Sequence, residues 1–185
     1  PDSRTINAVE VRVHHPDGRP TALDEEGEIQ SRGPAVCHGY VDPVATEAAF
    51  DADGWFHTGD IGRVDAGGYV TLTGRLKDII IRKGENIAAR EIEDVLYAHP
   101  KVAAVAVIGL PDVERGERVC AVVEIADGAE DLTMADVVAA CAEAELMVQK
   151  VPEQLVVHDG PMPRNATLKV LKYELKEALA EVPWP

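Results

Sequence analysis

The pattern of apolar residues changes near residue 74, and this change constrains the fold more than any other feature. Upstream, short alternating segments separated by turn residues predict β-strands over 8–14, 27–32, 61–64 and 69–73, with one short helix over 42–50. Downstream, helix-like spacing alternates with Val- and Ala-rich segments typical of buried strands. The sequence therefore predicts an α+β protein, with a mostly-β part over 1–73, a linker or hinge over 74–77, and a small α+β domain over 78–185.

Within the second part, strands are expected over 78–83, 102–108, 118–125 and 154–157. Helices are expected over 90–99, from an N-cap at Thr133 onward, and over 170–182. The side chains expected to point inward from these helices are Ile92, Val95, Leu96, Met134, Val137, Val138, Cys141, Leu171, Leu175, Ala178 and Val182.

The charge of the chain excludes two classes of partner. Asp and Glu outnumber Lys and Arg by 33 to 18, for a net charge of -15, which disfavours non-specific binding to nucleic acid or to an anionic membrane. No apolar run approaches the ~18 residues that span a bilayer. The three cysteines are widely spaced, so neither a disulfide framework nor a zinc site is indicated, and a reducing cytoplasm fits best.

Two basic islands lie within this acidic background. The first, residues 75–83, holds four cations and one anion, and the second runs from Arg164 to Lys176. Such islands can concentrate a small polyanion locally. The alternative is that both are solvated faces, as charge runs usually are.

Four short segments carry residues suited to chemistry. In residues 55–60, the Asp60 carboxylate could accept hydrogen bonds from a sugar diol, or it could simply cap a turn. In 74–78, the planar donors of Arg75 suit ribose or phosphate oxygens, and Lys77 with Asp78 forms either a hinge or a surface linker.

The other two segments place lysines in polar loops. Gly84, after Lys83, permits a close approach to a ligand, although a plain hairpin turn would use the same residues. Lys169, before the last predicted helix, could reach phosphate oxygens or be merely solvated. We expect no metal site and no serine-hydrolase site, because neither ligand spacing nor a Gly-x-Ser-x-Gly sequence occurs.

Taken together and in order, these segments resemble the acyl-adenylate-forming superfamily of acyl-CoA synthetases, peptide-synthetase adenylation domains and luciferases. The resemblance is carried by 55–60, 74–93 and 163–169, with support from 27–29, 109–112 and 116–117, and it covers nearly the whole chain. It implies that residues 1–73 are the last β subdomain of the large domain, that 74–77 is the hinge, and that 78–185 is the mobile C-terminal domain.

The resemblance also implies roles for individual residues. Asp60 and Arg75 would bind the ribose of ATP and AMP, and Lys77 would be the pivot between two half-reactions. Lys169 would be the catalytic lysine, which binds the reacting carboxylate and the α-phosphate during adenylation. Lys83 and Gly84 would line the pantetheine channel during thioester formation.

Two departures from the family pattern stand out. Leu168 replaces the usual Gly before the catalytic lysine and could restrict the loop, and Ala88-Ala89 replaces the usual aromatic-Pro pair, a change expected to be mild. The phosphate-binding loop, the Mg-associated Glu and the acyl pocket of the family have no counterpart in these residues and are expected upstream. We therefore expect the chain by itself to be inactive with ATP, Mg and CoA.

The resemblance predicts a fatty acid:CoA ligase that uses ATP, Mg and CoA. One alternative is an adenylating enzyme that passes the acyl group to a carrier protein, and another, of a different class, is a non-catalytic interaction module. The expected partners are a small carboxylic acid, ATP and CoA. A homodimer is a further expectation, since apolar surface exposed on residues 1–73 would favour self-association.

Overall fold

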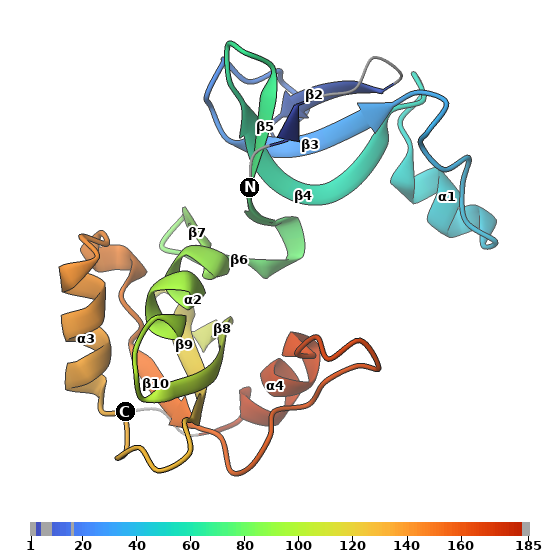
Figure 1. The fold of residues 1–185 in the computed structure, drawn as a ribbon. Helices are drawn as coiled ribbons and strands as arrows, with labels where there is room; N and C mark the ends of the chain where they lie inside the picture. Colours follow the sequence, from blue (N-terminus) through green and yellow to red (C-terminus); the bar gives the residue numbers. More distant parts are fainter. Residues whose placement is uncertain (1–2, 5–8, 16, 183–185) are drawn as a thin grey trace. The chain divides into compact units, whose positions relative to one another are not determined.

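The computed structural model describes residues 3–4, 9–15 and 17–182, and it divides the chain into two compact units, Pro1–Lys77 and Asp78–Pro185 (Figure 1). The boundary falls at the end of the segment 74–77 that the sequence analysis assigns to a hinge. The mixture of sheet and helix confirms the predicted α+β class. Each unit is described by itself below.

The first unit is built on an antiparallel sheet in the order β1-β5-β4-β3-β2. Its strands are β1 (Ser3–Arg4), β2 (Glu10–His14), β3 (Gly27–Arg32), β4 (Phe56–Val64) and β5 (Tyr69–Arg75). The short helix α1 (Pro43–Ala49) begins at Asp42, whose carboxylate accepts the Val44 N–H, as the Asp-Pro sequence predicts. The predicted strand over 27–32 and the helix are confirmed, and residue 8 of the first predicted strand lies outside the described residues.

Strand β2 begins at Glu10, so Val9 of the first predicted strand lies outside it, and two further strand boundaries in the first unit were predicted wrongly. Strand β4 begins at Phe56, five residues before the predicted start at Ile61, and β5 continues two residues past Thr73 to Arg75. The early part of β4 contains Gly59 with a φ of 68°, a backbone conformation that looks like a turn in the sequence. The longer strands bring Asp60 and Arg75 into register as direct cross-strand partners.

The second unit has a five-stranded sheet in which β9 is the central member. Strand β9 (Gly116–Ile125) pairs with β8 (Val102–Asp112) antiparallel, with β10 (Gln154–Val157) parallel, and at one end with β6 (Ile79–Arg82). Strand β7 (Glu85–Ala88) pairs with β6 and was not predicted, because it is short and only Ile87 in it is buried. Helices α2 (Ala89–Tyr97), α3 (Met134–Glu143) and α4 (Lys172–Leu179) pack around this sheet, and the 3-10 turn η2 (Val148–Lys150) precedes β10. A second 3-10 turn, η1 (Leu76–Asp78), spans the boundary between the two units.

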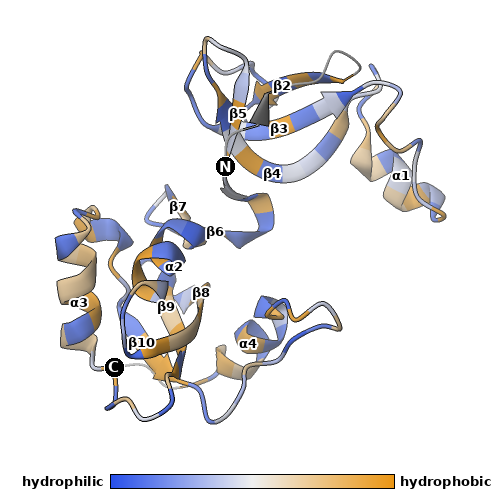
Figure 2. Ribbon diagram, in the orientation of Figure 1, coloured by the Kyte–Doolittle hydropathy of each residue, from blue (hydrophilic) through white to orange (hydrophobic). Residues whose placement is uncertain are grey.

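The middle of strand β9, residues 119–123, is buried on both faces, which explains its continuous apolar sequence (Figure 2). Val119, Ala121 and Val123 belong to the core cluster that includes residues of α2 and α3. The alternate residues Cys120 and Val122 belong to a second cluster, which includes Leu175 of α4. The period of two along the strand therefore assigns successive side chains to two separate cores.

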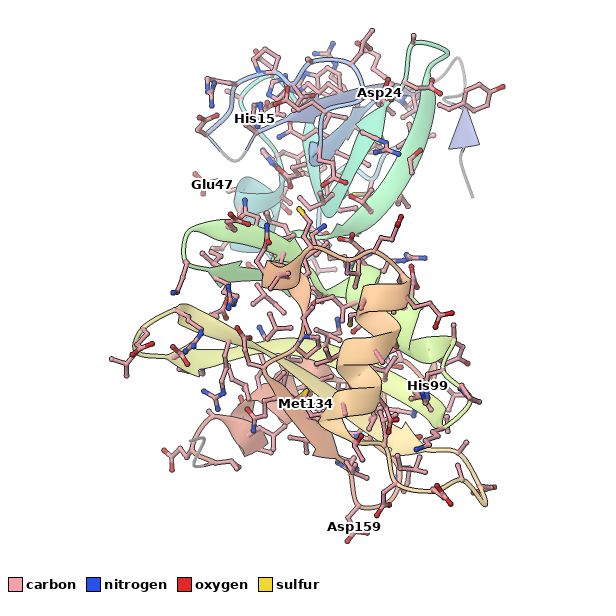
Figure 3. All side chains as sticks on the ribbon, turned by 90° about the vertical axis from the view of Figure 1, so that its left-hand side faces the viewer. His15, Asp24, Glu47, His99, Met134 and Asp159 are labelled. Atoms are coloured by element: carbon pink, nitrogen blue, oxygen red, sulfur yellow. The ribbon has the colours of Figure 1, made fainter. Side chains whose placement is uncertain are left out.

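Helix α3 is fixed at its start by a capping box. Thr133 accepts the Asp136 N–H, and Asp136 accepts the Thr133 N–H in return, just before Met134 (labelled in Figure 3) opens the helix. Hydrogen bonds from the backbone and hydroxyl of Thr133, with one from Lys101, lower the pKa of Asp136 to about 2. The predicted N-cap is confirmed.

Three side chains predicted to point inward from helices are exposed instead. Val138 on α3 is 45% exposed, and Ala178 and Val182 are exposed at the C-terminal end of the chain. The last helix ends at Leu179 rather than at Val182, and Leu179 packs against the core where Ala178 was expected. A helix with several apolar residues allows more than one inward face, and tertiary packing selects one of them.

The neighbours Val137 and Val138 offer a matched test of this packing. Val137 is fully buried, so Val137→Ala should lower the free energy of unfolding of the second unit by about 1–2.5 kcal/mol. Val138→Ala gains the same helix propensity and loses little burial, so its effect should stay within about 0.5 kcal/mol. Denaturant unfolding of the two variants checks this, and equal losses would contradict the assignment of the buried face.

Candidate functional site

The best-defined polar pair of the first unit is Asp60 on β4 with Arg75 on β5. Arg75 Nε lies 2.8 Å from Asp60 Oδ1. The side chain of Asp60 is 26% exposed and that of Arg75 is 45% exposed. Within the described residues, Asp60 Oδ2 has no hydrogen-bond partner, and the carboxylate caps no backbone N–H. The turn-capping alternative for Asp60 is therefore not what the structure shows. One carboxylate oxygen and part of a guanidinium fork face solvent together, an arrangement suited to a vicinal diol.

The segment that leads to Asp60 is anchored by an aromatic side chain. Trp55 is buried, and the guanidinium carbons of Arg12 and Arg32 lie 4.3 and 4.5 Å from its ring centroid. Asp51 accepts hydrogen bonds from the Trp55 N–H and from Arg12. Burial would raise the pKa of Asp51, yet these hydrogen bonds outweigh it and lower the pKa below its ordinary value. This cation–π arrangement fixes the start of β4.

Lys77 lies in the 3-10 turn η1, at the last position of the first unit. Its side chain is exposed, and the described residues offer it no ion-pair partner. A short turn with few packing contacts is the type of segment that can absorb a change in backbone dihedral angles.

Lys83 and Gly84 are the two central residues of the hairpin between β6 and β7. Arg82 pairs with Glu85 across the turn, and φ is 51° at Lys83 and 83° at Gly84, as in a type I′ turn. The hairpin is attached to the start of β9, because the Lys83 N–H donates to the Arg115 carbonyl and Arg82 pairs with Gly116. The Lys83 ammonium is exposed and makes no ion pair within the described part of the chain.

Lys169 lies in a closed loop between β10 and α4. The Asn165 side chain accepts hydrogen bonds from the Thr167 hydroxyl and from the Thr167 and Lys169 N–H groups. The backbones of Arg164 and Val170 form an isolated antiparallel β-bridge that closes the loop. Lys169 itself is exposed, and its ammonium has no partner among the described residues. The loop is therefore ordered by its own side chains while its lysine stays available.

The departure at Leu168 has a visible structural cost. Leu168 has a φ of 64° and is 74% exposed, so a bulky residue occupies a backbone conformation that favours Gly. The family's Gly at this position, as the resemblance describes it, would adopt the conformation without strain.

Sequence reasoning missed the residues that hold these loops. Glu124, near the end of β9, accepts hydrogen bonds from the Met162 N–H at 2.7 Å and from Arg164 at 2.9 Å, and so anchors the Lys169 loop. Lys172 forms an ion pair at 2.7 Å with Glu93 of α2, which ties the start of α4 to the core. No local pattern marks such partners, since each pair is far apart in the sequence.

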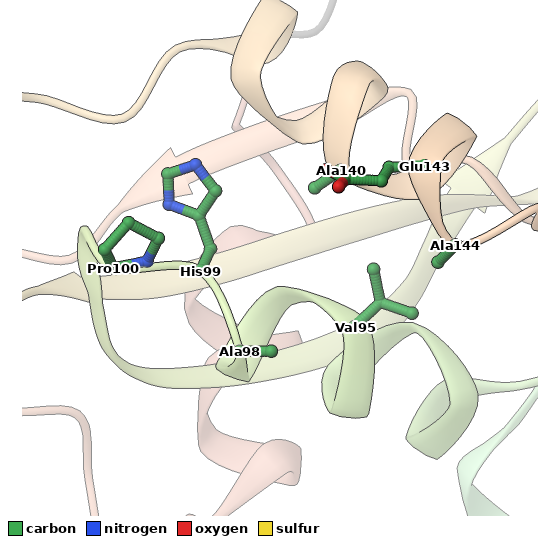
Figure 4. A pocket seen from close by; sticks show the side chains of 7 residues that line it. All are labelled: Val95, Ala98, His99, Pro100, Ala140, Glu143 and Ala144. Carbon is green, nitrogen blue, oxygen red and sulfur yellow. The ribbon is translucent and has the colours of Figure 1, made fainter.

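Other features of the described residues lie outside this set. A hollow of about 370 Å³ between α2 and α3 is lined by Val95, His99 and Glu143 among others (Figure 4), and it contains none of the predicted site residues. No group of three or more His, Cys, Asp or Glu in the described residues could hold a metal ion. No helix among them is long and apolar enough to cross a bilayer.

The structure thus places the six predicted residues in two sets. Asp60, Arg75 and Lys77 belong to the first unit, and the structure brings Asp60 and Arg75 into direct contact. Lys83, Gly84 and Lys169 belong to two different loops of the second unit.

Residues 91–169 match the family described as the AMP-binding enzyme C-terminal domain. The chain thus contains this domain, and its similarity to acyl-CoA ligases and other adenylating enzymes covers nearly its whole length. The resemblance noted from the sequence is therefore confirmed.

Relatives of this superfamily match almost the whole chain. The medium-chain fatty-acid–CoA ligase of Escherichia coli is 39% identical over 177 residues, which cover 95% of this chain and 31% of the relative. A feruloyl-CoA synthase of Amycolatopsis is 41% identical over 167 residues, covering 90% of this chain and 33% of the relative. The chain thus spans about a third of the length of these relatives.

A solved relative gives the same result in three dimensions. The ATP-bound structure of MatB from Rhodopseudomonas palustris aligns with a TM-score of 0.86 at 36% identity, covering 97% of this chain and 35% of that one. The apo structure of the same protein aligns over the same 97% with a TM-score of 0.68. The two structures of that relative therefore differ from each other over the aligned region.

The contribution of Glu124, which anchors the Lys169 loop, to the free energy of unfolding should depend on pH. Burial would raise the pKa of Glu124, but the hydrogen bonds from Met162 and Arg164 outweigh it and lower the pKa below 4.5. A carboxyl group with a depressed folded-state pKa stabilises the fold above its unfolded pKa and loses this effect as the pH falls. Glu124→Gln should therefore cost about 1–2 kcal/mol of unfolding free energy at pH 7, with the difference from wild type shrinking below pH ~4.5.

Thermal or denaturant unfolding of wild type and Glu124→Gln from pH 3 to pH 7 measures this difference. Glu143→Gln, an exposed position on α3, is the control and should show little difference at any pH. A Glu124→Gln deficit that does not change with pH would contradict the assigned role of the charge.

The strain at Leu168 should be relieved by Gly. A left-handed conformation costs an L-residue about 1–2 kcal/mol, and the greater chain entropy of Gly offsets about 0.5–1 kcal/mol of that gain. Leu168→Gly should therefore leave the second unit equally stable or more stable, by up to about 1.5 kcal/mol. Leu23→Gly, at an exposed leucine without a positive φ, should be destabilising. A loss of stability in Leu168→Gly as large as in Leu23→Gly would contradict the strain.

Proposed function

We propose that the protein is an ATP-dependent carboxylic acid:CoA ligase that acts through an acyl-AMP intermediate. One observation carries this proposal: the first unit presents a carboxylate paired with a guanidinium, and the second unit presents two exposed ammonium groups on separate loops, neither with an ion-pair partner among the described residues. The match to the AMP-binding enzyme C-terminal domain and the similarity to CoA ligases support it.

In this proposal, Asp60 and Arg75 bind the ribose of ATP and AMP. A charged carboxylate is a strong acceptor for two neighbouring hydroxyl groups, and Asp60 Oδ2 is available for them. The ion pair with Arg75 holds the carboxylate in one orientation and leaves further guanidinium donors for the sugar. The first unit would thereby keep the nucleotide in place through both half-reactions.

Lys169 serves the first half-reaction. The carboxylate of the acid attacks the α-phosphorus of ATP, an acyl–phosphate bond forms, and the bond to pyrophosphate breaks. Negative charge accumulates on the carboxylate and phosphate oxygens along this path, and a mobile ammonium group stabilises it. Magnesium would accompany ATP, and we assign it no ligand among these residues.

Lys83 and Gly84 serve the second half-reaction. The CoA sulfur attacks the acyl carbon, the thioester bond forms, and the bond to AMP breaks. The two-residue type I′ turn gives the hairpin a short, rigid tip that can lie against the pantetheine arm. The positively charged Lys83 ammonium group at this tip suits the anionic phosphates of CoA.

The positions of the two loops favour a rotation between the half-reactions. The Lys83 hairpin is attached to β9 at Gly116, whereas the Lys169 loop is attached at Glu124. At about 3.3 Å per residue, these anchor points are ~26 Å apart along one rigid strand. Reorientation of the second unit about Lys77 would bring the Lys169 loop to the nucleotide in the first half-reaction and the Lys83 hairpin in the second. The difference between the ATP-bound and apo structures of MatB is consistent with such a reorientation.

The acid is proposed to be a fatty acid. The support is similarity to a medium-chain fatty-acid–CoA ligase over 95% of the chain. A panel of acids of increasing chain length, assayed with the full-length protein, tests this part of the proposal.

The two half-reactions separate the roles of the lysines in the full-length protein. Lys169→Ala should slow acyl-AMP formation about 10²–10³-fold, as expected for loss of one transition-state donor, and affect thioester formation from supplied acyl-AMP much less. Lys83→Ala should show the reverse order of effects. Pyrophosphate release and thioester formation, followed separately, measure both steps.

Lys176→Ala is the matched control, because Lys176 belongs to the same basic island and lacks an ion pair in the described structure. It should leave both steps within about twofold of wild type. Equal slowing of both steps by all three variants would indicate a general charge effect and count against the proposal.

A further inference from the structure

The residues around Asp60 interrupt the regular pairing of β3 with β4. Glu28 is opposite Ile61 and Gln30 is opposite His57, so Ile29 alone faces Thr58, Gly59 and Asp60. Such a bulge leaves backbone groups without their usual ladder partners and re-aims the side chains that it carries. The orientation of Asp60 therefore depends on whatever else holds these three residues.

Part of the missing pairing is supplied within the bulge. The Thr58 hydroxyl donates to the Ile29 carbonyl at 2.5 Å and accepts the Asp60 N–H at 3.0 Å. Gly59 adopts a φ of 68°, which allows the chain to turn within the strand. These contacts hold Thr58 and Asp60 but give no partner to the Gly59 N–H.

Glu28 supplies the remaining partner from the neighbouring strand. Its Oε1 accepts the Gly59 N–H at 3.2 Å, and its Oε2 lies 2.8 Å from His57 Nδ1 and 3.2 Å from Gln30 Nε2. Gln30 Nε2 also lies 3.1 Å from His57 Nδ1, so the His57 ring is in contact with both side chains. Glu28 thereby binds both sides of the bulge at once.

The orientation of Gln30 is fixed as well. Arg12 Nε donates to Gln30 Oε1 at 2.7 Å, so the amide must direct its nitrogen towards Glu28. The residue Glu28 is only 8% exposed, and such a buried carboxylate requires several donors. Within the described residues, Glu28 has three hydrogen-bond partners. They are the Gly59 N–H in the bulge, the His57 ring at its edge and the Gln30 amide, whose orientation is fixed.

From these contacts we propose that Glu28 is a positioning residue for the ribose-binding carboxylate of Asp60. It touches no substrate and acts by holding the Gly59 backbone and the His57 ring, which together set where Asp60 points. The inference rests on the proposed function for its ligand, the ribose of ATP. The negative charge of Glu28 is essential to this role. A Gln side chain there would direct its own N–H group at one of these N–H donors, which would leave that donor without an acceptor.

The test is a double-mutant cycle in the full-length protein, with ATP affinity measured by calorimetry. Glu28→Gln should weaken ATP binding about tenfold, and Asp60→Ala at least as much. In the Asp60→Ala background, Glu28→Gln should add less than about a twofold loss, because its effect passes through Asp60. Glu28→Asp, which keeps the charge, enters the same cycle should Glu28→Gln not fold.

A second measurement separates positioning from general stability. Hydrogen exchange of the segment 57–60 should accelerate at least about tenfold in Glu28→Gln, while the other strands of the first unit exchange at the wild-type rate. Val13→Ala, at a buried residue of the same sheet that makes none of these hydrogen bonds, should destabilise the unit without changing ATP affinity.

The outcomes distinguish the inference from the proposed function. Independent, multiplicative losses in the double variant, or an unchanged ATP affinity in Glu28→Gln when Asp60→Ala weakens binding, would overturn the positioning role and leave the function standing. Failure of the wild-type protein to bind ATP would overturn the proposed function and, with it, the ligand named here.

Discussion

The second unit depends on one strand that is buried on both faces. Successive residues of β9 alternate between two cores, so the helices on either side are fixed relative to the same backbone. The ends of this strand also fix both lysine loops, through Gly116 at one end and Glu124 at the other. This arrangement bears on the chemistry proposed for the unit, because the two loops are anchored ~26 Å apart along one strand. The proposed function therefore requires the unit to reorient between the two half-reactions.

Electrostatic pairing decides which cations are available. In a chain of net charge -15, four of the eight arginines and lysines of the two basic islands form an ion pair with an acidic partner in the described structure. Arg75 pairs with Asp60, Arg164 with Glu124 and Lys172 with Glu93. Lys83 and Lys169 are exposed at the tips of their loops, beyond reach of such partners in the described structure. Because the rest of the chain is acidic and repels anions, an anionic ligand should be attracted chiefly to the loops that carry these ammonium groups.

The sequence predicted the elements that have a clear period or a local signal. The Asp-Pro start of α1, the Thr133 cap of α3 and the Val-rich strand β9 are examples. The boundaries of β4 failed because a glycine with positive φ inside a strand has the same sequence signature as a turn. Val138 failed because adjacent valines on a short helix do not reveal which of them faces the core. Tertiary packing decided both cases.

The candidate site divides in the same way. Asp60, Arg75 and the lysines could be selected from the sequence because they belong to motifs with a family resemblance. Glu28, Glu124 and Asn165 could not be assigned their roles, since these depend on partners brought near by folding. A single buried glutamate in a strand carries no local mark of what it accepts. Its role became visible only through the irregular register of β3 and β4.

The two-residue turn at Lys83 and Gly84 also limits how this element can diverge among homologues. Successive strand residues alternate between the faces of the sheet, so an insertion that shifted the register of β7 by one residue would exchange its buried and solvent faces and expose Ile87. The burial of Ile87 therefore constrains the length of this turn. Variation at the hairpin is expected mainly as substitution of the two turn residues, with the backbone kept as it is.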